Sequence, residues 1–142
     1  MKPNLLLKDN RGFSLIEIMV VMIIIGLLAS FIGPQLFGKL GKAKQTTAKA
    51  QIEMLMTALD AYRLDVGKYP SQQEGLEALV RNPGESDWVG PYLAKAKIPL
   101  DPWKHPYLYR NPGQTGEVEI SSLGNDNKEG GEGEDADVNS GD

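Results

Sequence analysis

The sequence contains no cysteine and only one histidine, His105, among its 142 residues. Disulfide bonds are therefore excluded, and the softer metal ligands are almost absent. The lack of cysteine leaves the redox compartment open, because such a chain suits a reducing cytosol and an oxidising periplasm equally well. A lone histidine without a nucleophile motif is expected to be a turn residue, so the sequence predicts a protein that is not an enzyme.

The formal charge of −4 is unevenly distributed along the chain. Residues 1–12 carry a local charge of +2, so the remainder carries −6. The closing segment, residues 125–142, holds seven acidic side chains against Lys128 alone. A nucleic acid is not an expected partner, because this part of the chain would repel a phosphate backbone.

A long apolar run follows Glu17. The 21 residues from Ile18 to Gly38 carry no charge, and at about 1.5 Å per residue a helix of that length matches the hydrocarbon thickness of a bilayer. A cleaved signal peptide is the alternative, but Glu17 interrupts its apolar region and Leu28 fits poorly before a cut at Ser30. Lysines on both sides of the run leave the orientation undecided.

The helical periodicity continues beyond the apolar run. One narrow stripe of an amphipathic helix recurs at spacings of three and four, and its members are Ala48, Ile52, Leu55, Leu59 and Tyr62. The pattern predicts a single helix from about Phe13 to about Leu64. Pro34 and the glycines near it weaken the middle, so we expect a bend there, or local melting when subunits pack.

The rest of the chain predicts a small domain with a sheet. Ser71 and Glu74 form a capping-box pattern that predicts a short second helix, with Leu76, Leu79 and Val80 on one face. Two strands are predicted at 107–110 and 117–121, around a turn rich in glycine and proline. The expected fold class is α+β: a long N-terminal helix packed on a small antiparallel sheet.

The acidic tail is a candidate metal loop. Asp126, Asp135 and Asp137 lie among glycines, and oxygen ligands in a flexible loop suit Ca²⁺, which takes about six to eight of them. The spacing is not that of an EF-hand, because a twelve-residue frame begun at Asn125 puts Ala136 where the glutamate belongs. A solvated, disordered tail is the alternative, although a metal would tie down a small domain that has no disulfide.

Several motifs together carry a family resemblance. "RGFSLIEIMVV" resembles the prepilin peptidase site of type IV pilins and pseudopilins. "KYPSQQEGLEALV", "DPWKHPYLYRNPGQTGEVEISSLG" and "DNKEGGEGEDADV" resemble, in this order, the major pseudopilins of type II secretion systems. The resemblance covers nearly the whole chain and implies a pilin-like fold.

The resemblance implies processing at the N-terminus. A leader, residues 1–12, would be cut between Gly12 and Phe13 on the cytoplasmic side, and the new amino group of Phe13 would be N-methylated. Residues 13–38 would form the membrane-spanning and filament-core helix, and residues 39–142 the periplasmic domain. In a filament, Glu17 would meet the Phe13 amine of a neighbouring subunit, and this pair would set the register.

The resemblance also implies a ligand set for Ca²⁺ within a loop at residues 123–138. Side-chain oxygens would come from Asp126, Asp135 and Asp137, and backbone carbonyls from Leu123 and Lys128. Extra glycines in the loop leave Glu134 as a possible substitute for one of the carboxylates.

The function implied by the resemblance is that of the major structural subunit of a pseudopilus. Copies of the chain would assemble into a helical filament with minor pseudopilins, prepilin peptidase and an inner-membrane assembly platform as partners. The filament would help push folded proteins through the outer membrane. Two alternatives are a surface type IV pilin, for adhesion or DNA uptake, and a membrane-anchored periplasmic calcium-binding protein.

Overall fold

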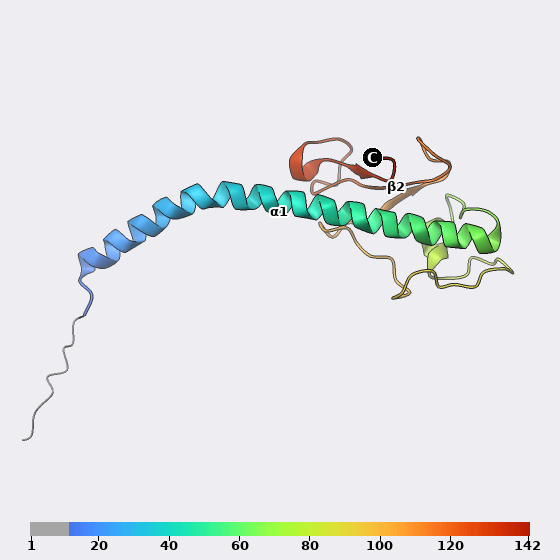
Figure 1. The fold of residues 1–142 in the computed structure, drawn as a ribbon, viewed down its shortest axis with the longest axis horizontal. Helices are drawn as coiled ribbons and strands as arrows, with labels where there is room; N and C mark the ends of the chain where they lie inside the picture. Colours follow the sequence, from blue (N-terminus) through green and yellow to red (C-terminus); the bar gives the residue numbers. More distant parts are fainter. Residues whose placement is uncertain (1–11) are drawn as a thin grey trace, which may run out of the picture. The chain divides into compact units, whose positions relative to one another are not determined.

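The computed structural model describes residues 12–142, which form two compact units divided after Phe37: the first ends there, and the second is Gly38–Asp142 (Figure 1). The predicted leader lies almost entirely outside the described residues. Helix α1, Leu15–Val66, passes from the first unit into the second. The helix continues through Pro34 without a break. The single chain therefore keeps helical structure at this position.

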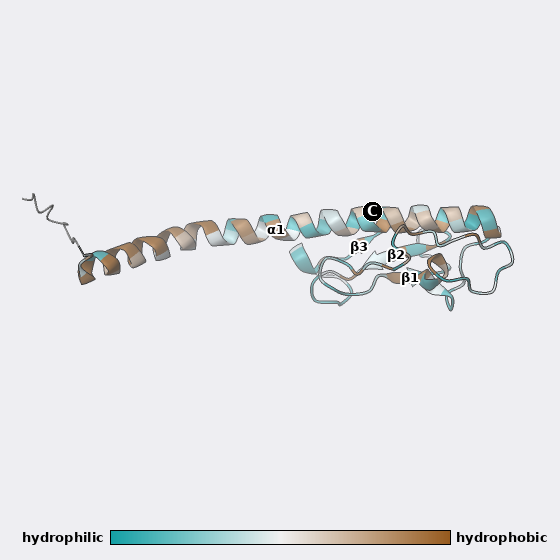
Figure 2. Ribbon diagram, turned by 90° about the horizontal axis from the view of Figure 1, so that it is seen from below, coloured by the Kyte–Doolittle hydropathy of each residue, from teal (hydrophilic) through white to brown (hydrophobic). Residues whose placement is uncertain are grey.

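The first unit contains the apolar part of α1. Ser14 caps the helix, because its Oγ accepts a hydrogen bond of 3.2 Å from the backbone N–H of Glu17. The large apolar side chains that follow are exposed within this chain, and the candidate membrane-spanning window has none of its residues buried. Figure 2 shows this segment as a nearly continuous hydrophobic stretch.

The second unit folds around the amphipathic half of α1. The predicted stripe is confirmed, since Ala48, Ile52, Leu55, Leu59 and Tyr62 are each at most 1% exposed. The helix packs against side chains from the rest of the unit, chiefly Leu79, Trp103, Tyr107, Ile120 and Val138. Burying these apolar side chains supplies the main stabilisation of the unit.

The predicted second helix is wrong in type. The capping box is present, since Glu74 N–H donates to Ser71 Oγ at 3.2 Å and Ser71 N–H donates to Glu74 Oε2 at 2.7 Å. The element that follows is a single 3₁₀ turn, η1, Gly75–Leu79. Gly75, the first residue of this turn, has a φ of +60°, which lies outside the α-helical region, so the capping box does not continue into an α-helix. The buried face is formed by Leu76, Ala78 and Leu79, while Val80 is half-buried.

The sheet has three antiparallel strands in the order β1–β2–β3. Strands β1, Leu108–Arg110, and β2, Glu119–Ser122, confirm the predicted pair with shifted bounds, and Tyr109 lies opposite Ile120. The third strand, β3, Val138–Asn139, was not predicted; its Val138 lies opposite Ser122. With the 3₁₀ turn η2, Gly133–Asp135, this strand orders the acidic tail, so the tail is not the solvated, disordered end considered from composition.

Candidate functional site

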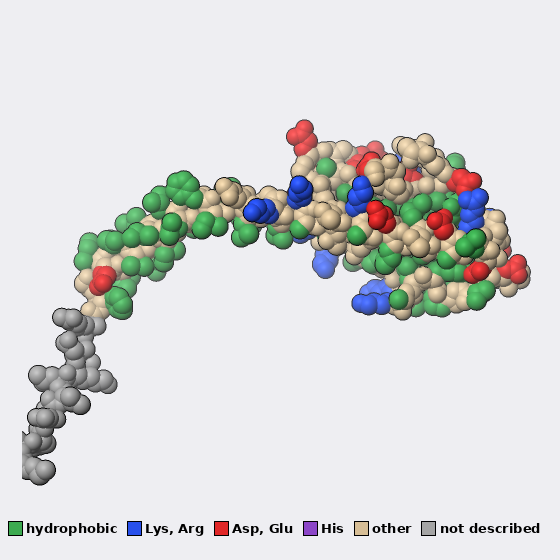
Figure 3. Space-filling model, in the orientation of Figure 1, with side chains coloured by type: hydrophobic (Ala, Val, Ile, Leu, Met, Phe, Trp, Pro, Cys, Tyr) green, Lys and Arg blue, Asp and Glu red, His purple; other side chains and the backbone are tan. Residues whose placement is uncertain are grey.

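The N-terminal candidate site is the head of α1. Phe13 is 77% exposed, and Glu17 lies in the first turn of the helix. Figure 3 shows one acidic group at this end of an otherwise hydrophobic surface. Sequence reasoning missed the role of Ser14, although the Ser-x-x-Glu spacing from Ser14 to Glu17 is itself a capping-box signal.

The apolar surface behind Glu17 has no cover within its own chain. Residues with half or more of their surface exposed include Ile16, Met22, Ile23, Leu27 and Phe31. A contiguous exposed apolar surface of this kind needs lipid or another protein to cover it. A carboxylate at its edge needs a cation or water for the same reason.

The C-terminal candidate site is a loop that closes on itself. Asn125 N–H donates to the Glu134 carbonyl at 2.9 Å. Gly124 has a φ of +67°, and a Cβ at this position would lie within 2.9 Å of backbone atoms of residues 134–136. Only glycine fits a left-handed backbone at such close approach, so Gly124 is required where the loop begins.

The loop also docks on α1 within the second unit. Gln45 donates to the Gly133 carbonyl, and a Cβ at Gly41 would lie 2.6 Å from Glu134 Oε1. Figure 1 shows this C-terminal segment beside the middle of α1. The carboxylate of Glu134, the substitute ligand considered from sequence, is therefore placed against the helix.

The three predicted carboxylate ligands are held by different loop contacts. Asp126 Oδ1 accepts from Lys128 N–H at 3.1 Å, and Asp135 Oδ1 accepts from Asn125 Nδ2 at 3.2 Å. Asp137 Oδ2 accepts from Gly130 N–H at 2.9 Å. Across residues 12–142, the structure gathers no three acidic, histidine or cysteine side chains into a preformed metal cluster.

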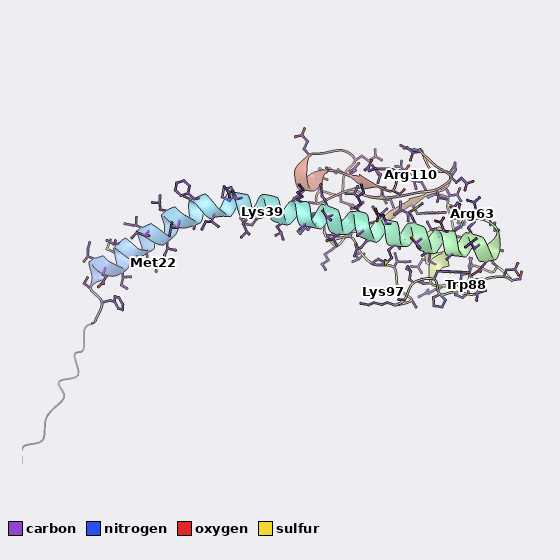
Figure 4. All side chains as sticks on the ribbon, in the orientation of Figure 1. Met22, Lys39, Arg63, Trp88, Lys97 and Arg110 are labelled. Atoms are coloured by element: carbon purple, nitrogen blue, oxygen red, sulfur yellow. The ribbon has the colours of Figure 1, made fainter. Side chains whose placement is uncertain are left out.

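One atom of the loop nevertheless fits a bound cation. Asp137 Oδ1 is buried and has no hydrogen-bond partner, which is costly for a carboxylate oxygen unless a positive group satisfies it. Asp137 and Leu123 line the same pocket, of about 240 Å³, whereas Asp126, Lys128 and Asp135 do not line it. Arg110, labelled in Figure 4, also lines this pocket and pairs with Glu129 at 3.2 Å. The ligands predicted from sequence are all oxygen donors, the kind that a hard divalent cation prefers.

A buried polar network at the base of the loop was missed by sequence reasoning. The side chain of Asp101 is fully buried and accepts hydrogen bonds from Trp103 N–H at 3.0 Å and His105 N–H at 2.8 Å. It also accepts one from the Ser122 hydroxyl at 2.7 Å. The Asp-Pro start of "DPWKHP" is a turn signal that could have identified this role. His105 lies directly after this turn and is half-buried, and its Nδ1 lies 3.1 Å from the Gly124 carbonyl.

Comparison with known proteins places these sites in a family. Residues 7–33 match the family described as "Prokaryotic N-terminal methylation motif", so the chain is one of the proteins that carry this motif at the N-terminal end of an apolar helix. Residues 35–141 match the family described as "Type II secretion system (T2SS), protein G". The chain belongs to this family of type II secretion proteins.

Named relatives and a solved structure agree with that assignment. "Type II secretion system core protein G" of Pseudomonas aeruginosa is 47% identical over 135 residues, which cover 92% of this chain and 94% of the relative. The protein of the same name from Vibrio cholerae is 43% identical and covers 93% and 92%. The crystal structure of the major pseudopilin from the type 2 secretion system of enterohaemorrhagic Escherichia coli matches with a TM-score of 0.63 and 32% identity, over 75% of this chain and 93% of that one. The predicted fold class and the pseudopilin resemblance are confirmed.

Proposed function

We propose that this chain is the major structural subunit of a type II secretion pseudopilus. Copies of it assemble into a helical filament that helps push folded proteins through the outer membrane, and the subunit itself catalyses no reaction. The observation that carries the proposal is the uncovered apolar surface of α1 with Glu17 at its head, in a chain of the protein G family.

The apolar helix has two environments in this proposal. Before assembly it spans the inner membrane, with residues 39–142 in the periplasm. In the filament, the same surface is covered by the helices of neighbouring copies. Lipid and a helix bundle are similarly apolar, so exchange between them is governed by packing and polar contacts more than by the hydrophobic effect. The contact joins different surfaces of two copies and does not close into a ring. It therefore propagates as a fibre.

Glu17 and the Phe13 amine supply the polar contact that fixes the register. Prepilin peptidase cuts after Gly12 and the new amine is methylated, which places a cation one helical turn from Glu17. Between neighbouring subunits, the carboxylate and the amine offset each other's desolvation cost. Minor pseudopilins and the inner-membrane assembly platform are the further partners of the growing filament.

Mass spectrometry of the mature N-terminus tests this function. The chain purified from a host with a type II secretion system should begin at Phe13 with a methylated amine. Gly12→Val should leave an uncut precursor in the membrane, because the peptidase cleft no longer accepts the residue before the cut. A mature chain that begins at Met1 or Phe31 would contradict the proposal.

We further propose that the loop at residues 123–138 binds Ca²⁺. Support comes from the orphaned Asp137 Oδ1 and from the position of Leu123 and Asp137 in the same pocket. When bound, the ion would offset part of the negative charge of the loop and link β2 to the tail. Asp126, Asp135 and the Lys128 carbonyl would complete the ligand set by moving with the loop.

Thermal melting with CaCl₂ and with a chelator tests the cation site. The parent chain should gain stability from Ca²⁺, and Asp137→Asn should lose most of that gain because a neutral amide replaces the buried carboxylate. Asp87→Asn is the matched control, since Asp87 is an exposed acid outside the loop. Equal melting of the parent with Ca²⁺ and with chelator would refute the site.

A further inference from the structure

The strongest unassigned feature is the buried link between Asp101 and the first residues of the loop. Ser122 is fully buried at the end of β2. Its hydroxyl donates to Asp101 Oδ2 at 2.7 Å and accepts from Gly124 N–H at 3.4 Å. Asp101 is itself fixed by two backbone N–H groups of its own turn. The hydroxyl is therefore held in one orientation by a rigid acceptor.

This hydroxyl controls the direction of a backbone carbonyl. Gly124 N–H and the Leu123 carbonyl belong to one peptide group, which is planar, so in its trans form the two point in opposite directions. When Ser122 Oγ accepts from Gly124 N–H, the Leu123 carbonyl must point away from Ser122. The far side of Gly124 is held as well, because its carbonyl accepts from His105 Nδ1 at 3.1 Å.

The peptide group between Leu123 and Gly124 borders the proposed cation site. Leu123 lines the pocket that Asp137 also lines. Gly124 contacts the backbone of residues 134–136, the segment that leads to Asp137. A rotation of the 123–124 peptide would therefore disturb both sides of the proposed cation site.

We propose that Ser122, held by Asp101, is a positioning residue for the cation site: it fixes the Leu123 carbonyl as a ligand. The inference rests on the proposed binding of Ca²⁺ and extends it to residues that do not touch the ion. It predicts that cation affinity depends on the Ser122 hydroxyl separately from the stability of the fold.

Substitutions of equal shape test this role. Ser122→Thr retains the hydroxyl, and Ser122→Val replaces it with a methyl group in a side chain of the same shape, so any packing cost of the larger side chain is shared. Tyr109→Phe is the control for loss of a buried hydroxyl bond elsewhere, because Tyr109 OH donates to the Pro70 carbonyl at 2.7 Å. The full chain in detergent is titrated with CaCl₂ by calorimetry, and its melting is recorded in chelator.

The expected result is that Ser122→Val binds Ca²⁺ about tenfold more weakly than Ser122→Thr, the effect typical of lost outer-shell support. Tyr109→Phe should melt earlier in chelator and keep the parent's affinity. Equal affinities of the Val and Thr variants would overturn the inference while leaving the cation site in place. A parent chain that binds no Ca²⁺ would overturn both, and the pseudopilus function would still be judged by the Phe13 terminus.

Discussion

The aromatic residues of the second unit show how single side chains respond to burial. Tyr62 and Tyr109 are 0% and 8% exposed, and burial raises the pKa of each phenol to about 12. Burial also raises the pKa of Tyr107. The neutral phenol is favoured in the folded state because the interior solvates a phenolate poorly. Tyr62 has no hydrogen-bond partner for its hydroxyl, so it depends on packing alone.

These shifts predict how stability changes with alkaline pH. The folded-state pKa lies above the unfolded value of about 10, so the folded chain holds the proton longer and stability is fully present below pH 10. The free energy of unfolding should fall as the pH rises from about 10 toward 12. Denaturant titrations across this range, followed with tyrosinate absorbance, measure the effect. Tyr109→Phe should show a shallower fall, and an identical fall would contradict the assignment.

Sequence reasoning was strongest where residue type alone decides the chemistry. The absence of cysteine and the apolar character of residues 18–38 needed no tertiary information. The buried bonds of Asp101 were out of reach, because its partner Ser122 lies 21 positions away and nothing in the spacing joins them. Ser14 was within reach, since its capping signal is local.

At the scale of elements, α1 was predicted well because its signal is long. A stripe repeated over many turns outweighs local breakers such as Pro34. Strand β3 has only two residues, so it carries no periodicity that a sequence could reveal. The prediction of an α-helix at η1 was wrong for a conformational reason, because Gly75 has a positive φ.

The docking of the loop on α1 makes a prediction about two glycines of one helix. Gly41 is buried against Glu134, whereas a Cβ at Gly38 would meet nothing within 4 Å. Both Gly→Leu changes gain helix propensity of about 0.8 to 1 kcal/mol. Gly41→Leu should also displace the Glu134 side chain from the helix, at a cost of about 1 to 3 kcal/mol.

Chemical denaturation of both glycine variants in detergent measures the difference. Gly38→Leu serves as the matched control, because it changes the same residue type one turn earlier on the same helix. Gly41→Leu should have the lower free energy of unfolding. If the two variants were equally stable, the contact between Glu134 and Gly41 would not contribute to the folded state.

At the scale of the whole molecule, the features divide into a folded unit and an uncovered helix. The second unit satisfies its own core, whereas the apolar residues of the first unit have no partner in the described chain. Covering the apolar surface of such a chain requires lipid or another protein. In the proposed function, Glu17 at the head of this helix has water or headgroups as its surroundings in the membrane and a neighbour's amine in the filament.

Mixed assembly tests Glu17 at this scale. In the proposed filament, each contact between neighbouring copies pairs Glu17 of one copy with the Phe13 amine of another. Removing one member of such a buried pair costs about 3 to 5 kcal/mol. Glu17→Ala should be processed and inserted but should assemble poorly alone. When the variant is co-expressed with the parent, filament length should fall more steeply than the fraction of parent subunits falls. The reason is that each variant subunit leaves the amine of its neighbour unpaired. Electron microscopy of filament length at several expression ratios measures this.

Two controls distinguish the interruption of assembly by incorporated variant subunits from the effect of a smaller amount of parent chain. Glu53→Ala removes an exposed acid of α1 in the second unit and should leave filament length unchanged at every ratio. Gly12→Val, kept as a precursor, should stay out of the filament, so length should follow only the amount of parent chain. Filaments of normal length from Glu17→Ala alone would contradict the role of Glu17 and would show that packing of the apolar surface sets the register.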